Sequence, residues 1–125
     1  MSKFTNLIDF LADYHDQVMG CEKKALAALD GGDADAYRAL MKEKAEKMAR
    51  IAEEAAPYLE QEPEYIRSEA GHSLKAFAAS AKMGLRLQSP FYWSALLWDE
   101  DAKPGDPDTL QVFISELSSE ISGKE

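Results

Sequence analysis

Three ionisable side chains interrupt apolar helical faces in the first half of the chain, where they could do chemistry. His15 and Glu22 are seven residues apart on one such face, and Lys44 interrupts the next one. If the two helices pair antiparallel, both residues face the second helix, with Glu22 within reach of Lys44 and His15 opposite Met48. A buried histidine beside an ion pair could form a small-ligand or proton-transfer site. Alternatively, the three residues are partly exposed at the edge of the seam and set helix register.

The segment PFYWSALLW, residues 90–98, is the second candidate site. It contains both tryptophans of the chain and is followed at once by three acidic residues. A helix this short cannot easily bury its whole circumference in a small bundle. An aromatic patch edged by acid is typical of an interaction hot spot for a basic, amphipathic partner. The predicted partner-binding residues are Phe91, Tyr92, Trp93, Leu97, Asp99, Glu100 and Asp101.

The two tryptophans are predicted to differ in environment. On a helical projection Trp93 lies about 140° from Trp98. We expect Trp98 to be the more buried of the two, docked on the small residues Ala76 and Ala79 and on Met83. Trp93 should then line an exposed patch or a dimer interface. The alternatives are that the whole segment is core, or that it is buried against its own copy in a homodimer.

Several other chemistries lack the residues that they require. Glu69 and His72 have the Glu-x-x-His spacing of di-iron bundles, but no second such motif exists, and His72 is predicted to point away from the core. An EF-hand that starts at Asp99 would have Lys103 at its fifth position. With one cysteine, Cys21, and two histidines, transition-metal and Cys–His chemistry are poorly supplied. We predict no catalytic residue, metal site or cofactor.

The elements that must position these residues are helices, because apolar residues recur at three- and four-residue steps through most of the chain. The pattern predicts an all-α bundle of four main helices plus a short aromatic helix. Breaks are expected near Gly31 and Gly32, between Leu59 and Pro63, near Ser89 and across 103–106. Together these elements form a single domain, 1–125.

Three details of the helices are predicted from single residues. Pro57 should kink or end the second helix, because it lacks an N–H and its ring clashes with the preceding turn. Asp106 should cap the final helix, with Pro107 as its first residue. The third helix has a second apolar side, which includes Met83 and Leu87, and is expected to be the central element that packs on more than one neighbour.

The composition limits the class of protein and of partner. The chain has 125 residues, a hydrophobic fraction of 46% and a formal net charge of −9, as expected of a globular, acidic domain. An acidic surface repels nucleic acid and anionic membranes and attracts basic partners. The chain begins without a signal-peptide pattern, lacks a segment that could span a bilayer, and has a lone cysteine, which fits a reducing compartment. We therefore expect a cytoplasmic protein without direct nucleic-acid or membrane binding.

These observations favour a non-enzymatic protein-interaction module that binds a partner, or itself, through the aromatic patch. In size, charge and helix pattern the chain resembles the small acidic helical chaperones and adaptors of bacterial export systems, although it shares no motif with them. One alternative is a small-ligand-binding or catalytic bundle that uses His15, Glu22 and Lys44. Another is an acidic inhibitor that mimics nucleic acid, but the second helix mixes its acids with bases such as Arg38 and Arg50.

Overall fold

The computed structural model describes residues 6–98, 103 and 105–123, and this part of the chain contains helices and no strand. The predicted all-α bundle is confirmed. The helices, in chain order, are α1 (Leu7–Asp30), α2 (Ala34–Ala49), α3 (Ile51–Leu59), α4 (Glu64–Leu87), α5 (Pro90–Ala95) and α6 (Thr109–Gly123).

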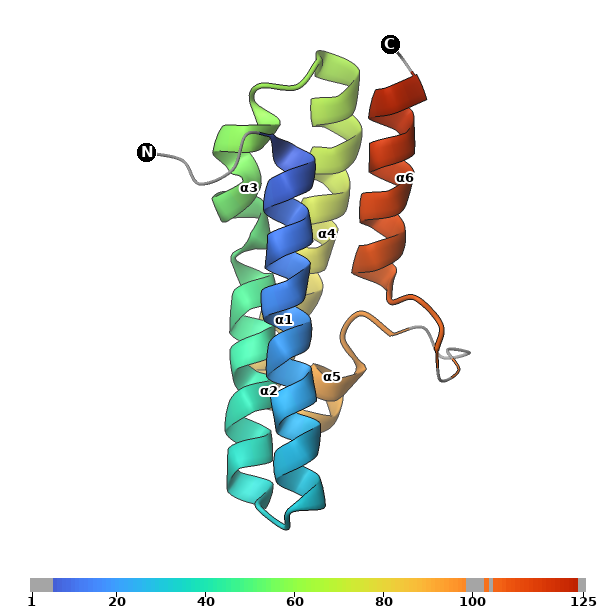
Figure 1. Ribbon diagram of the computed structural model, residues 1–125. Helices are drawn as coiled ribbons and strands as arrows, with labels where there is room; N and C mark the ends of the chain where they lie inside the picture. The colour runs from blue at the N-terminus through green and yellow to red at the C-terminus, as the bar shows by residue number, and fades with distance from the viewer. Residues whose placement is uncertain (1–5, 99–102, 104, 124–125) are drawn as a thin grey trace.

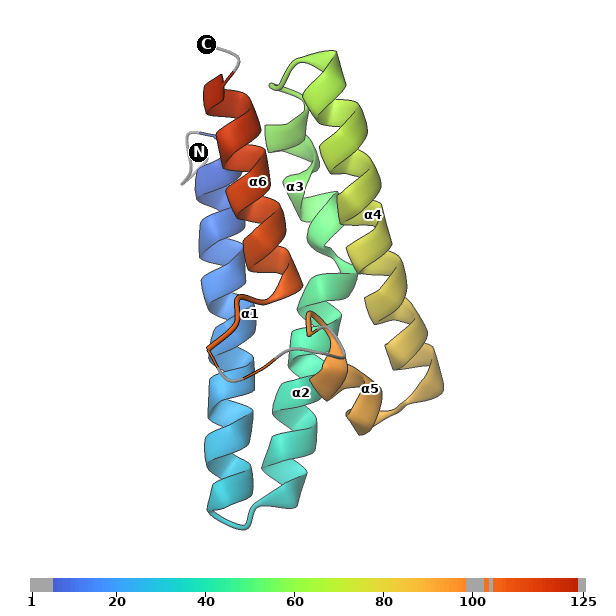
Figure 2. The same cartoon turned by 90° about the vertical axis from the view of Figure 1, so that its right-hand side faces the viewer.

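The helices pack as a hairpin with further helices added to its sides (Figure 1). α1 runs down and α2 and α3 run back up beside it, and α4 then packs along α2 and α3. The short α5 lies against α2 and α4 near the lower half of the bundle, and α6 returns to lie beside α1. Figure 2 shows that α6 runs roughly antiparallel to α4 and that α5 lies below the start of α6.

The first two helix starts follow from capping side chains. The Asn6 side chain accepts a hydrogen bond from the Asp9 backbone N–H at 2.9 Å, and the Asp33 side chain accepts one from the Ala36 backbone N–H at 3.0 Å. Between α1 and α2, Gly32 has a φ of +83°, a conformation that L side chains rarely adopt. The sequence Asp30-Gly31-Gly32-Asp33 therefore reverses the chain where it was predicted to.

The second predicted helix contains an additional break, which lies seven residues before Pro57. α2 ends at Ala49, and Arg50, with a φ of −103° and a ψ of 0°, separates it from α3. The Tyr14 hydroxyl donates a hydrogen bond to the Lys47 carbonyl beside this break, and a side chain inserted at the helical ladder is a known cause of kinks. Pro57 lies inside α3, which ends two residues later at Leu59, close to where Pro57 was predicted to kink or end the helix.

The start of α6 also differs from the prediction. The side chain of Asp108, not that of Asp106, accepts a hydrogen bond from the backbone N–H of Gln111, at 2.8 Å, and caps the helix. The Asp106 carboxylate instead accepts from the Lys103 backbone N–H, also at 2.8 Å. Because Asp106 is engaged in its own turn, the helix begins at Thr109.

The core lies mainly between α1, α2, α3 and α4 and includes small residues that let the helices approach closely. α4 contributes one buried face, with Ile66, Ala70, Leu74, Ala78, Ala81 and Gly84. The second apolar side predicted for α4 is not packed: Met83 and Leu87 are more than half exposed. The aromatic segment docks on the Gly84 side of α4 instead.

Candidate functional site

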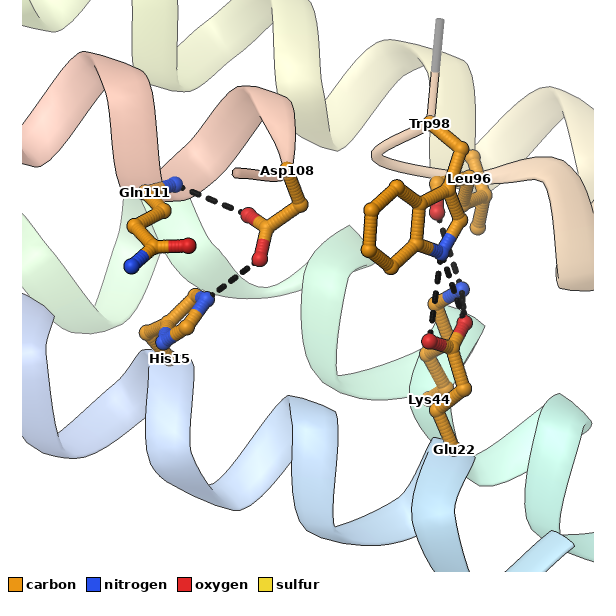
Figure 3. Close-up of polar contacts among 7 residues, drawn as sticks. All are labelled: His15, Glu22, Lys44, Leu96, Trp98, Asp108 and Gln111. Atoms are coloured by element: carbon orange, nitrogen blue, oxygen red, sulfur yellow. Dashed lines mark hydrogen bonds and ion pairs between the residues drawn. The ribbon is translucent and has the colours of Figure 1, made fainter. Parts of the chain in front are cut away.

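Glu22 and Lys44 form the predicted ion pair between α1 and α2, and the pair is buried (Figure 3). The Lys44 ammonium donates to Glu22 Oε1 at 2.6 Å and to the Leu96 carbonyl oxygen at 2.8 Å. The indole N–H of Trp98 lies 3.0 and 3.1 Å from the two carboxylate oxygens of Glu22. Lys44 is fully buried and Glu22 is only 7% exposed. The pair therefore holds the chain that follows α5 against the α1–α2 hairpin.

The burial of this pair decides between the alternatives for the inner polar residues. The expectation that they are partly exposed at the edge of the seam is wrong for Glu22 and Lys44. Burial lowers the pKa of Lys44, and the hydrogen bond and charge of Glu22 oppose that shift. The ammonium is surrounded by protein acceptors, and an amine with no solvent-accessible surface offers no approach to a substrate. The pair fits a structural role better than a catalytic one.

His15 does not belong to this pair, and the prediction that it faces the second helix is wrong. Its Nε2 atom lies 2.6 Å from Asp108 Oδ2, so it contacts the capping residue of α6 (Figure 3). The hydrogen bond to Asp108 raises the pKa of His15 and outweighs the opposing effect of burial. Burial would raise the pKa of Asp108, but hydrogen bonds from His15 and from the backbone N–H groups of Gln111 and Leu110 lower it. The His15–Asp108 pair therefore connects the start of α6 to α1.

The tryptophans have the opposite environments to those predicted. Trp93 is buried, with 6% of its surface exposed, and its indole N–H donates to the Gly84 carbonyl oxygen at 2.9 Å. Trp98 is only half-buried. The helical projection fails because α5 ends at Ala95 and Leu97 has a φ of +76°, so Trp98 lies beyond the helix.

The predicted partner-binding patch is only partly a surface. Trp93 and Leu97 belong to the core, and Tyr92 is half-buried. Asp99, Glu100 and Asp101 lie outside the described residues, as does the side chain of Phe91. The segment therefore serves mainly as the base and one wall of a neighbouring cleft.

This cleft has a volume of about 590 Å³ and lies between α4, α5 and α6. Its lining is largely apolar, and the rings of Phe77 and Phe113 meet across it with centroids 5.7 Å apart. Several lining residues are exposed, among them Ala76 and Val112, so the cleft opens to solvent along its length. The lining residues are Met48, Ser73, Ala76, Phe77, Ser80, Tyr92, Ala95, Leu96, Leu97, Thr109, Val112, Phe113 and Glu116.

A small acid-lined notch continues the cleft toward the other end of α6. It has a volume of about 90 Å³ and shares Ser73, Phe113 and Glu116 with the cleft. Glu69 from α4 and Glu120 from α6 complete its acidic lining. No described lysine, arginine or histidine lines either hollow.

The cleft was not predicted from the sequence, although apolar residues that line it were recognised there. Phe77 and Phe113 follow the apolar periodicity of their helices, which predicts burial but not that a cleft stays open between the two helices. Comparisons with protein-family models, with curated proteins and with solved structures found no match. Within the described part of the chain, no helix is both long enough and apolar enough to cross a membrane.

Proposed function

We propose that this protein is a non-enzymatic interaction module, adaptor-like or chaperone-like, that binds a segment of another protein in the cleft between α4, α5 and α6. The observation that carries the proposal is the open apolar cleft itself. When a partner covers water-exposed apolar side chains in a concave surface, the free energy of the system falls. The aromatic segment takes part through Tyr92 and Ala95, which line the cleft.

The shape of the cleft favours a protein segment over a small metabolite. A small-molecule site usually buries most of its ligand within a concave pocket. Here Ala76, Ser80, Val112 and Glu116, which line the cleft from two helices, are all exposed. A groove that opens to solvent between two helices suits the docking of one face of a helix from a partner.

The inner polar residues support this reading over a catalytic one. Lys44 has no exposed surface and donates to the Leu96 carbonyl oxygen, while the Leu96 side chain lines the cleft. The buried ion pair thus fixes the base of the cleft in position. A preformed base lowers the ordering cost that binding must overcome.

Site-specific photo-crosslinking in the native cell tests the proposal. Benzoylphenylalanine at Val112, which is 38% exposed in the wall of the cleft, should form an adduct with a partner protein. The matched control is the same substitution at Leu26, an apolar α1 residue that is 48% exposed and lines neither the cleft nor the notch.

The adduct should form from position 112 and be absent from position 26. It should also be lost when Ala76→Asp, on the opposite wall, places a charge in the cleft, while circular dichroism shows unchanged helicity. Equal adducts from both positions, or none from position 112, would contradict a binding role for the cleft. An adduct formed only with a second copy of this chain would contradict a different protein as the partner.

A further inference from the structure

Charge is distributed unevenly along the groove made by the cleft and the notch. The α5 end is lined by apolar and aromatic side chains, and Glu116 is the only ionisable carboxylate of the described residues that line the cleft. The notch adds Glu69 and Glu120, so three carboxylates gather at that end. None of the ion pairs found among the described residues includes Glu69 or Glu116.

From this distribution we infer that the occupant of the groove is an amphipathic helix of a partner protein, with an apolar stripe that covers the cleft and lysine or arginine side chains that meet Glu69 and Glu116. The inference rests on the proposed function and adds the chemistry of the partner. An acidic helix would place its charges against these carboxylates, and like charges at an interface disfavour association.

The dimensions agree with a short helical segment. Thr109 and Glu120, at the two ends of the groove on α6, are eleven residues apart, which corresponds to about 17 Å of helix. That length faces about three turns of a partner helix, enough for apolar residues at positions i, i+3 or i+4, and i+7. The basic residues should follow this stripe at one end of the segment.

Fluorescence anisotropy with three labelled synthetic peptides of 18 residues tests the inference. The first has a leucine stripe at helical spacing with lysines elsewhere, the second replaces each lysine by glutamate, and the third is a scramble of the first. The lysine peptide should bind the full chain at least about tenfold more tightly than either of the others. Raising the salt concentration from 0.02 to 0.2 M should reduce its advantage over the glutamate peptide, because exposed charges are then screened.

Two double variants of equal net charge separate the groove from the acidity of the whole surface. Glu69→Gln with Glu116→Gln should weaken binding of the lysine peptide about three- to tenfold, as expected for two exposed charge contacts. Glu46→Gln with Glu53→Gln, which are exposed acids that line neither hollow, should leave it nearly unchanged. An equal loss in both variants, or equal binding of the scrambled peptide, would overturn the inference.

A Val112→Asp variant keeps this test distinct from that of the proposed function. If the glutamate peptide binds as well as the lysine peptide and Val112→Asp abolishes both, the cleft binds helices but the inferred charge preference is wrong. If Val112→Asp alters the binding of neither peptide, the cleft is not the binding surface and both proposals fail. Circular dichroism of each variant confirms that a loss of binding is not a loss of fold.

Discussion

Among the fully buried side chains of the described residues, that of Lys44 is the largest. Its ammonium is balanced by the Glu22 carboxylate and by the Leu96 carbonyl oxygen, and Glu22 also accepts the indole N–H of Trp98. No buried side-chain nitrogen or oxygen of the described residues lacks a hydrogen-bond partner. The desolvation of such a pair can cost as much as its attraction returns, so its worth lies in fixing geometry more than in stability.

Breaking this pair from one side should be far more damaging than removing it whole. Lys44→Met leaves the Glu22 carboxylate buried without its cation, and we expect a loss of roughly 3–5 kcal/mol in the free energy of unfolding. The double variant Glu22→Gln with Lys44→Met should lose clearly less than the sum of the two single variants. Urea unfolding of the four proteins measures this coupling, and additive single effects would show that the two residues do not interact.

The His15–Asp108 pair should make stability depend on pH. The folded-state pKa of His15 is raised above 6.5, so its contribution is complete below pH 6.5 and is lost as the pH rises through the folded pKa. The folded-state pKa of Asp108 is lowered below 3.8, so its contribution is lost only as the pH falls through that lower value. Two further charged groups are coupled to this pair. Asp16 raises the pKa of His15, and the charge of Asp108 acts to raise the pKa of Lys44.

We therefore expect the free energy of unfolding to fall by on the order of 1 kcal/mol as the pH rises from 6 to 8.5. Substituting His15→Gln, which keeps a hydrogen-bond donor but does not titrate, should flatten that slope in urea unfolding. The other histidine of the chain, His72, is exposed and provides the control. If His72→Gln flattened the slope as much as His15→Gln, the His15–Asp108 pair would not be the origin of the pH dependence.

At the scale of elements, the packing of α5 on α4 depends on a missing side chain. A Cβ atom added at Gly84 would lie 2.6 Å from Cδ1 of Tyr92 and 3.3 Å from Cδ1 of Trp93. The same glycine offers its carbonyl oxygen to the Trp93 indole. Glycine inside a helix costs about 0.5–1 kcal/mol relative to alanine, and here it lets two aromatic rings approach the backbone.

Gly84→Ala should therefore destabilise the fold, because the clash outweighs the gain in helix propensity. We expect a net loss of about 1–3 kcal/mol in the free energy of unfolding, as is usual for overpacked sites. Gly20→Ala in α1 is the matched control, since an added Cβ there meets nothing within 4 Å, and it should stabilise by up to about 1 kcal/mol. Thermal melts of the two variants decide the point, and a stabilising Gly84→Ala would contradict this close packing.

The elements also show which parts of the structure could be predicted from sequence. Glu22 and Lys44 could be paired because both helices and the turn between them follow from local signals, which together fix the register of the hairpin. The partner of His15 could not be found this way, because Asp108 is 93 residues away and reaches α1 only through the placement of α6. Trp93 and Trp98 were interchanged because a helical projection assumes a helix, and α5 ends between them.

At the scale of the whole molecule, the cleft exists because α6 packs beside α1 while α4 follows α2 and α3 (Figure 2). A regular four-helix bundle would close its last helix against both neighbours. Here the contact from α6 to α4 includes the Phe77 and Phe113 rings, and the space toward α5 is left open. Periodicity in single helices cannot predict this opening, because it arises from the placement of elements that are far apart in the chain.

The Glu22–Lys44 and His15–Asp108 pairs differ in the length of chain that each one closes, and this sets an order of assembly. Glu22 and Lys44 are separated by 22 residues, whereas His15 and Asp108 are separated by 93. By the entropy of loop closure, the longer loop costs about 1.3 kcal/mol more to form from an open chain. The α1–α2 hairpin should thus form first and α6 should join last. The wall of the cleft that α6 provides is then the last part of the molecule to be put in place.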